Sequence, residues 1–111
     1  MNDENTTVAQ LRRAVQDFSA QRGWTDGENA KDLAMALAVE SAELLEIFQR
    51  LRSDRADSVR DDSRAFEHLR EEAADVLWYL VRICEHFDID LTRAVCDKAE
   101  KNAVKYPAPA R

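Results

Sequence analysis

The chain has 111 residues, which fits one small domain whose core buries a modest share of the surface. Its 22 acidic and 16 basic side chains give a net charge of −6, which argues against extensive electrostatic binding to the phosphate backbone of nucleic acid. No apolar run approaches the ~18 residues that a membrane span needs, and the acidic N-terminus lacks a signal segment, so we expect a cytoplasmic protein.

Turn-forming residues are scarce along the chain. Only two glycines and two prolines are present, and both prolines lie in the tail, which favours long helices over many short strands. We therefore predict an all-α fold, a bundle of four to five antiparallel helices forming one domain over residues 1–107, with a short tail over 108–111. Cys84 and Cys96 have neither zinc-site spacing nor the density of a disulfide scaffold, so we expect two reduced, partly buried thiols.

Thr6 or Thr7 can cap a first helix, which should end near Gly23, where glycine can adopt the left-handed conformation. Its apolar positions recur at three- and four-residue steps: Val8, Leu11, Val15 and Phe18. A connecting loop follows, with Asn29 as the N-cap of the next helix. Trp24 in this loop is either an anchor on the core or a platform for a ligand.

A second helix is expected over residues 30–52. Its inward positions alternate at spacings of four and three: Leu33, Leu37, Glu40, Leu44, Ile47 and Leu51. At ~100° per residue, Glu43 lies about 60° from Glu40, whereas Glu46 lies about 120° away. Glu40 and Glu43 thus lie on or beside an apolar face, where ionised carboxylates are seldom buried without a partner.

Residues 53–62 are polar and charged, which predicts a surface loop or a frayed start to a third helix over residues 63–86. The inward positions of this helix again follow four-and-three spacing: Leu69, Ala73, Val76, Leu80, Ile83 and Phe87. On the same side, Glu72 lies within the apolar stripe and Asp75 at its edge.

Asp90 can cap a last helix over residues 91–104, which Tyr106 and Pro107 terminate. Lys98, Asn102 and Lys105 are spaced four and three apart and therefore line one side of it. Taken alone, these lysines indicate a solvated face.

If the second and third helices pack antiparallel, the two carboxylate pairs converge on one pocket that must hold cations. Oxygen ligands without inward cysteine or histidine suit Mg²⁺ or Mn²⁺, and four carboxylates suggest more than one ion. Chance pairing, or arginine and lysine from a neighbouring subunit, would also explain the pattern. A di-iron bundle would want Glu-x-x-His, which is absent here. His68 precedes Glu72 by four residues and can approach the pocket, although a surface position is the simpler interpretation.

These motifs resemble the MazG-like nucleoside triphosphate pyrophosphohydrolases, a superfamily of all-α proteins. Its mark is Glu-x-x-Glu followed by Glu-x-x-Asp, which appears here as Glu40-Ser-Ala-Glu43 and Glu72-Ala-Ala-Asp75. A C-terminal match covers Lys98-x-x-x-Asn102-x-x-Lys105-Tyr106-Pro, and the similarity extends from about residue 18 to 107.

The resemblance implies hydrolysis of a nucleoside triphosphate to the monophosphate and pyrophosphate, removing surplus or unwanted nucleotides. It implies a homodimer or homotetramer that acts on a small molecule, without nucleic acid or membrane partners. Mg²⁺, with Mn²⁺ as a substitute, would be held by the catalytic carboxylates Glu40, Glu43, Glu72 and Asp75. Substrate contacts would come from Trp24, Lys98, Asn102, Lys105 and Tyr106.

Departures from the family concern the end that would hold the base. Members similar to dCTP pyrophosphatase commonly carry a histidine before the second helix and a tryptophan after its Phe-Gln. This chain has Glu28 and Arg50 at those positions, so we expect a pocket lined by Glu28, Trp24 and Arg50 whose base preference is open. The alternative to an enzyme is a helical dimerisation module with a structural or regulatory cation site.

Overall fold

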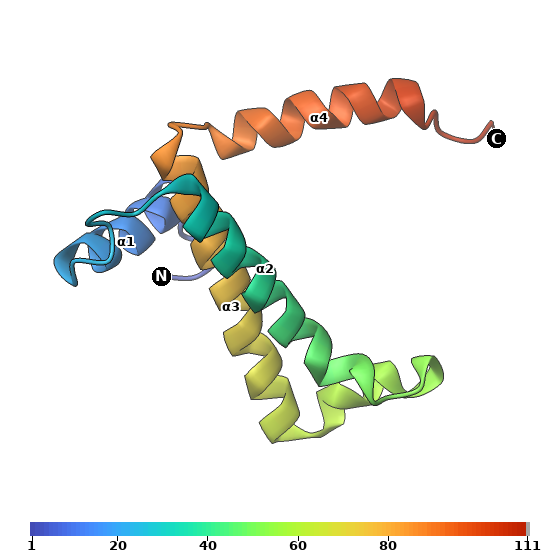
Figure 1. Cartoon of the computed structure of the whole chain (residues 1–111). Coiled ribbons are helices and arrows are strands. Elements are labelled where there is room, and N and C mark those ends of the chain that lie inside the picture. Colours follow the sequence, from blue (N-terminus) through green and yellow to red (C-terminus); the bar gives the residue numbers. More distant parts are fainter. Residues whose placement is uncertain (111) are drawn as a thin grey trace.

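The computed structural model describes residues 1–110 and is built from helices, with no strand in that range (Figure 1). The elements follow in the order α1 (Val8–Gln21), α2 (Ala30–Gln49), the 3₁₀ helix η1 (Ser53–Asp61), α3 (Ser63–His86) and α4 (Leu91–Lys105). The predicted all-α class is therefore confirmed.

Polar side chains define the starts of the helices, as the sequence predicts. Thr7 forms a reciprocal capping box with Gln10 at the start of α1. Asn29 accepts a hydrogen bond from a backbone N–H of α2, and Asp90 does the same for α4. These caps satisfy backbone donors that no helical hydrogen bond can reach, which fixes where each helix begins.

The charged segment after α2 differs from the expected loop. It forms η1, in which Val59 is buried and which packs against α3. Helix α2 ends at Gln49 rather than near residue 52, and the chain reverses over residues 50–62, so that α3 runs back antiparallel to α2.

The packed part of the molecule is made by α1, α2 and α3. In Figure 1, α2 and α3 run side by side, while α1 crosses the later half of α3. Trp78 on α3 donates its indole N–H to the hydroxyl of Ser19 on α1 at 3.1 Å. Among residues 1–110 the buried apolar side chains are few, namely Val15, Leu33, Val59, Val81 and Cys84.

Helix α4 departs from the expected bundle. It projects away from the other helices (Figure 1), and none of its described residues, 91–105, is buried. The turn before it places Asp88 at a φ of 54°, a left-handed conformation that aspartate tolerates better than most residues. The bundle prediction is thus wrong for α4 within a single chain.

Two global measures reflect this open shape. The radius of gyration is 17.0 Å, whereas about 13 Å is expected for a compact chain of this length. The accessible surface is 9020 Å², against about 6,200 Å² for a folded monomer of this mass. Within residues 1–110, no helix combines the length and apolar character needed to cross a membrane.

The two cysteines are both free but differ in exposure. Cys84 is buried in the core, whereas Cys96 on α4 is exposed. Both being free agrees with the predicted reduced thiols, but partial burial is wrong for each, because α3 packs against other helices and α4 does not.

Candidate metal centre

Three carboxylates converge between α2 and α3. Glu40 and Glu43 lie one turn apart on α2, and Glu72 faces them from α3. One oxygen of each lies within 4.8 Å of the others. Asp75 lies outside this group and is exposed, as its predicted place at the edge of the apolar stripe implies. The antiparallel packing therefore brings together three of the four predicted ligands.

The orientation of the carboxylates leaves oxygens without partners. Oε2 of Glu40 and Oε2 of Glu72 are buried and have no hydrogen bond within the described residues. The other oxygen of Glu72 lies 3.2 Å from Nε2 of His68, one turn earlier on α3. His68 thus contacts a member of the cluster. A buried carboxylate oxygen without a donor is costly, and a cation removes that cost.

The cluster raises the pKa of Glu40 from 4.5 to about 7. Burial is the largest cause, because it disfavours the charged form of the side chain. The neighbouring carboxylate of Glu43 adds to the shift, followed by Asp75 and Glu72. The raised pKa of Glu40 thus reflects its burial first and the negative charge of the neighbouring carboxylates second.

The donor set fits a hard divalent cation. Carboxylate oxygens are the ligands that Mg²⁺ and Mn²⁺ prefer, and no cysteine or additional histidine of the described cluster competes for a softer metal. Mg²⁺ usually keeps several waters and adds substrate phosphates, so three or four protein carboxylates suffice.

Stabilisation by Mg²⁺ is expected to depend on pH through Glu40. Without metal, its raised pKa favours the folded state fully below about pH 4.5, and this contribution is lost as the pH rises through about 7. Since Mg²⁺ competes with the proton, it should raise the Tm more at about pH 8 than at about pH 5.5.

Differential scanning fluorimetry with and without Mg²⁺ at both pH values measures this difference. Glu40→Gln should flatten it, because glutamine does not titrate in this range. An equal Mg²⁺ effect at both pH values in the wild-type chain would contradict the prediction.

An aromatic cluster lies beyond the carboxylates. Phe18 contacts Trp24 edge-on with ring centroids 5.6 Å apart, and it contacts Trp78 in the same way at 5.3 Å. Trp78 follows Asp75 by three residues on α3, which places it about one turn further along. Trp24 thus packs on Phe18, in agreement with the anchor interpretation, while half of its surface stays exposed.

The predicted pocket of Glu28, Trp24 and Arg50 is wrong within one chain. Glu28 precedes α2 and Arg50 follows it, and a helix of 20 residues is about 30 Å long. Arg50 therefore lies at the far end of α2 from Trp24. The carboxylate of Glu28 is also engaged, because it pairs with Arg82 of α3.

Arg82 is a residue of this region that the sequence interpretation missed. Its buried side chain donates to the backbone carbonyl of Trp24 at 2.6 Å and to the carboxylate of Glu28. Its position seven residues after Asp75 puts it on the same face of α3, which was the available signal.

The predicted substrate residues of α4 do not reach the carboxylates of their own chain. They lie on the projecting helix or at its end, where Lys98, Lys105 and Tyr106 are exposed and Asn102 is half-buried. The ammonium group of Lys105 lies 5.4 Å from the centre of the Tyr106 ring.

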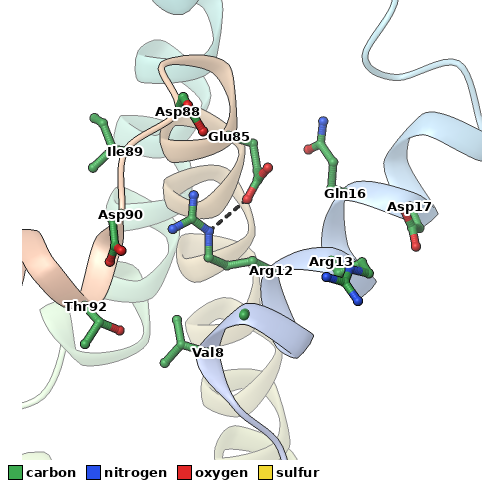
Figure 2. A pocket seen from close by; sticks show the side chains of 11 residues that line it. Val8, Arg12, Arg13, Gln16, Asp17, Glu85, Asp88, Ile89, Asp90 and Thr92 are labelled. Carbon is green, nitrogen blue, oxygen red and sulfur yellow. Dashed lines mark hydrogen bonds and ion pairs between the residues drawn. The ribbon is translucent and has the colours of Figure 1, made fainter.

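A separate cavity of about 770 Å³ opens between α1 and the turn that leads into α4 (Figure 2). An ion pair of 2.8 Å joins Arg12 and Glu85 across it. None of the four carboxylates predicted to bind metal lines this cavity. Its walls mix both signs of charge, so it has no feature that selects an anion or a cation, and the chemistry is better placed in the carboxylate cluster.

Comparison with known proteins identifies the family of the chain. The model of the MazG nucleotide pyrophosphohydrolase domain matches residues 28–108. Human dCTP pyrophosphatase 1 is 34% identical over 102 residues, and the rat protein of that name is 34% identical over 101 residues. These alignments cover 92% and 91% of this chain but 60% and 59% of the relatives, so the chain spans about three fifths of their length.

A solved structure is similar over its full extent. The crystal structure of a pyrophosphatase from Archaeoglobus fulgidus superposes with a TM-score of 0.81 at 36% identity, covering 97% of this chain and 99% of that one. Because the domain model matches well over half of the residues and the fold agrees with that of a solved pyrophosphatase, this chain belongs to the MazG nucleotide pyrophosphohydrolase family.

Proposed function

We propose that the chain catalyses the Mg²⁺-dependent hydrolysis of a (deoxy)nucleoside triphosphate to the nucleoside monophosphate and pyrophosphate. The observation that carries this proposal is the convergence of Glu40, Glu43 and Glu72 with two buried oxygens unpaired. Relatives named dCTP pyrophosphatase 1 and a pyrophosphatase support the same reaction class. The role would be maintenance of the cytoplasmic nucleotide pool.

In this proposal the carboxylates and Trp24 have separate roles. Glu40, Glu43, Glu72 and Asp75 would hold Mg²⁺, which when bound supplies charge neutralisation at the phosphates and a lowered pKa for an attacking water. One of these carboxylates would accept the proton of the water that attacks the α-phosphorus. The exposed indole of Trp24 would stack on the base.

We infer that the active species is a homodimer or a homotetramer. The accessible surface of 9020 Å² exceeds that of a compact monomer, and large apolar side chains remain exposed. They include Met35, Val39 and Leu45 on α2 and Val95 and Val104 on α4. A second copy that covers these side chains would supply the burial that one chain lacks.

Such an assembly would also complete the site. Because α4 projects away from its own carboxylates, the residues predicted to bind substrate would act on the cluster of a second copy. Two positive charges and an amide on one helical face suit a triphosphate whose other side is held by metal. These residues are Lys98, Asn102, Lys105 and Tyr106.

A pyrophosphate-release assay across the common and damaged nucleoside triphosphates tests the reaction. We expect turnover of at least one triphosphate with Mg²⁺, equimolar monophosphate and pyrophosphate, and loss of turnover on chelation. If no triphosphate is hydrolysed although Mg²⁺ raises the Tm, the dimerisation module with a regulatory cation site would replace the enzyme.

A further inference from the structure

Arg82 of α3 contacts the loop between α1 and α2. Its side chain is 7% exposed, and it donates both to the carbonyl of Trp24 and to the carboxylate of Glu28. Nδ1 of His86 lies 3.7 Å from the second oxygen of Glu28. Among the described hydrogen bonds, the one from Arg82 to the carbonyl of Trp24 is the only bond that joins the backbone of this loop to α3.

This contact lies on the same face as the metal centre. On α3, Glu72, Asp75, Tyr79, Arg82 and His86 follow one another at steps of three and four, which aligns them along one side of the helix. Arg82 lies seven residues beyond Asp75, or about 10 Å along the axis. A nucleotide with its phosphates at the carboxylates would extend its base toward this end.

We propose that Arg82 is a positioning residue that clasps the loop of residues 22–29 and so fixes Trp24 for stacking on the base. The proposal rests on the proposed function. A guanidinium can serve a carbonyl and a carboxylate together, whereas a lysine would serve one of them less well. The side chain of Glu28 is only 13% exposed and is paired with Arg82, so it is not a reader of the base edge.

The consequence concerns substrate selection. A carboxylate that accepted from a base would favour cytosine, adenine and guanine, whose exocyclic amino groups donate hydrogen bonds, over thymine, which has no such group. If Glu28 only holds the loop through Arg82, it has no preference among the bases, since stacking on an indole is available to every base. The site therefore selects a nucleoside triphosphate mainly through its phosphates and the stacking surface.

The first experiment compares Glu28→Gln, Arg82→Met and the double variant for hydrolysis of dCTP, dATP, dGTP and dTTP. Each variant should raise KM about tenfold for all four substrates with little change in kcat, because stacking is weakened while the carboxylates of the candidate metal centre are unchanged. The double variant should be no worse than Arg82→Met, since both act on one contact. Arg82→Lys should recover part of the loss.

Arg64→Met is the matched control, because Arg64 is an exposed arginine of the same helix. It should leave KM unchanged. A loss of kcat/KM in Glu28→Gln that affects dCTP, dATP or dGTP but spares dTTP would overturn the proposal, since Glu28 would then read the base. An unchanged KM in a folded Arg82→Met variant would also overturn it.

The second experiment needs no activity. Limited trypsin digestion, followed by mass spectrometry, should cut after Arg22 several times faster in Arg82→Met than in wild type or Arg64→Met, while sites in α2 and α3 stay protected. Equal cleavage rates would show that Arg82 does not hold the loop. If the wild-type chain hydrolyses nothing, the proposed function fails, and digestion alone then decides whether the clasp exists.

Discussion

Replacing Glu43 by glutamine is expected to lower kcat/KM at least about a hundredfold, the scale of losing one electrostatic contact to the charge that develops in a transition state. Glu43 is one of three carboxylates whose oxygens lie within 4.8 Å of one another. Glutamine keeps the size of the side chain but removes a negative charge from the cation site. The fold should survive, because Glu43 is only half-buried.

Glu46→Gln provides the matched control for that variant. Glu46 lies on the same helix, is exposed, and points about 120° away from Glu40. Steady-state rates of pyrophosphate release, with circular dichroism to verify folding, compare the two variants at equal Mg²⁺. Undiminished turnover in Glu43→Gln would sink the metal assignment, whereas equal losses in both variants would indicate a nonspecific charge effect.

Mixing two inactive variants is expected to restore activity if α4 serves the carboxylates of a second copy. One variant is Glu43→Gln, and the other is Lys98→Ala/Asn102→Ala on α4. In a randomly reassociated dimer, half of the molecules pair the two variants, and one of their two sites is intact. Turnover should therefore recover to about a quarter of the wild-type value.

The matched control mixes Glu43→Gln with Glu72→Gln, which alter the same half of the site. In that mixture each site carries the carboxylates of a single chain, so every site stays defective and no recovery is expected. Should the α4 mixture give only the average of its separate components, α4 would not act across the interface. Size-exclusion chromatography at several concentrations reports whether the chains have exchanged.

The helices were predictable because their signals are local. Capping by Thr7, Asn29 and Asp90 depends on a side chain within three residues of the backbone group that it satisfies. The 3₁₀ helix η1 was not predictable, since its charged sequence has little apolar periodicity and Val59 alone is buried within it. Short helices of this kind depend on the surface against which they pack.

The carboxylate pairs were also local signals. A spacing of three residues puts Glu40 beside Glu43, and an apolar stripe predicts that both lie near the packed face. How closely they approach Glu72, and that Asp75 stays outside their group, depends on the register between α2 and α3. That register is set by packing over the whole length of both helices.

The sequence by itself determined the helical class, the helix starts and the pairs of candidate metal-binding carboxylates, because each follows from residues a few positions apart. Only the tertiary structure decided that α4 projects away from the other helices of its own chain, that Arg50 is remote from Trp24, and that Glu28 pairs with Arg82. Glu28 and Arg82 are 54 residues apart, and no local pattern reports which charges meet when two helices pack. Contacts between distant residues are set by burial and shape over the whole fold, and here they decide which side chains remain free to contact a ligand.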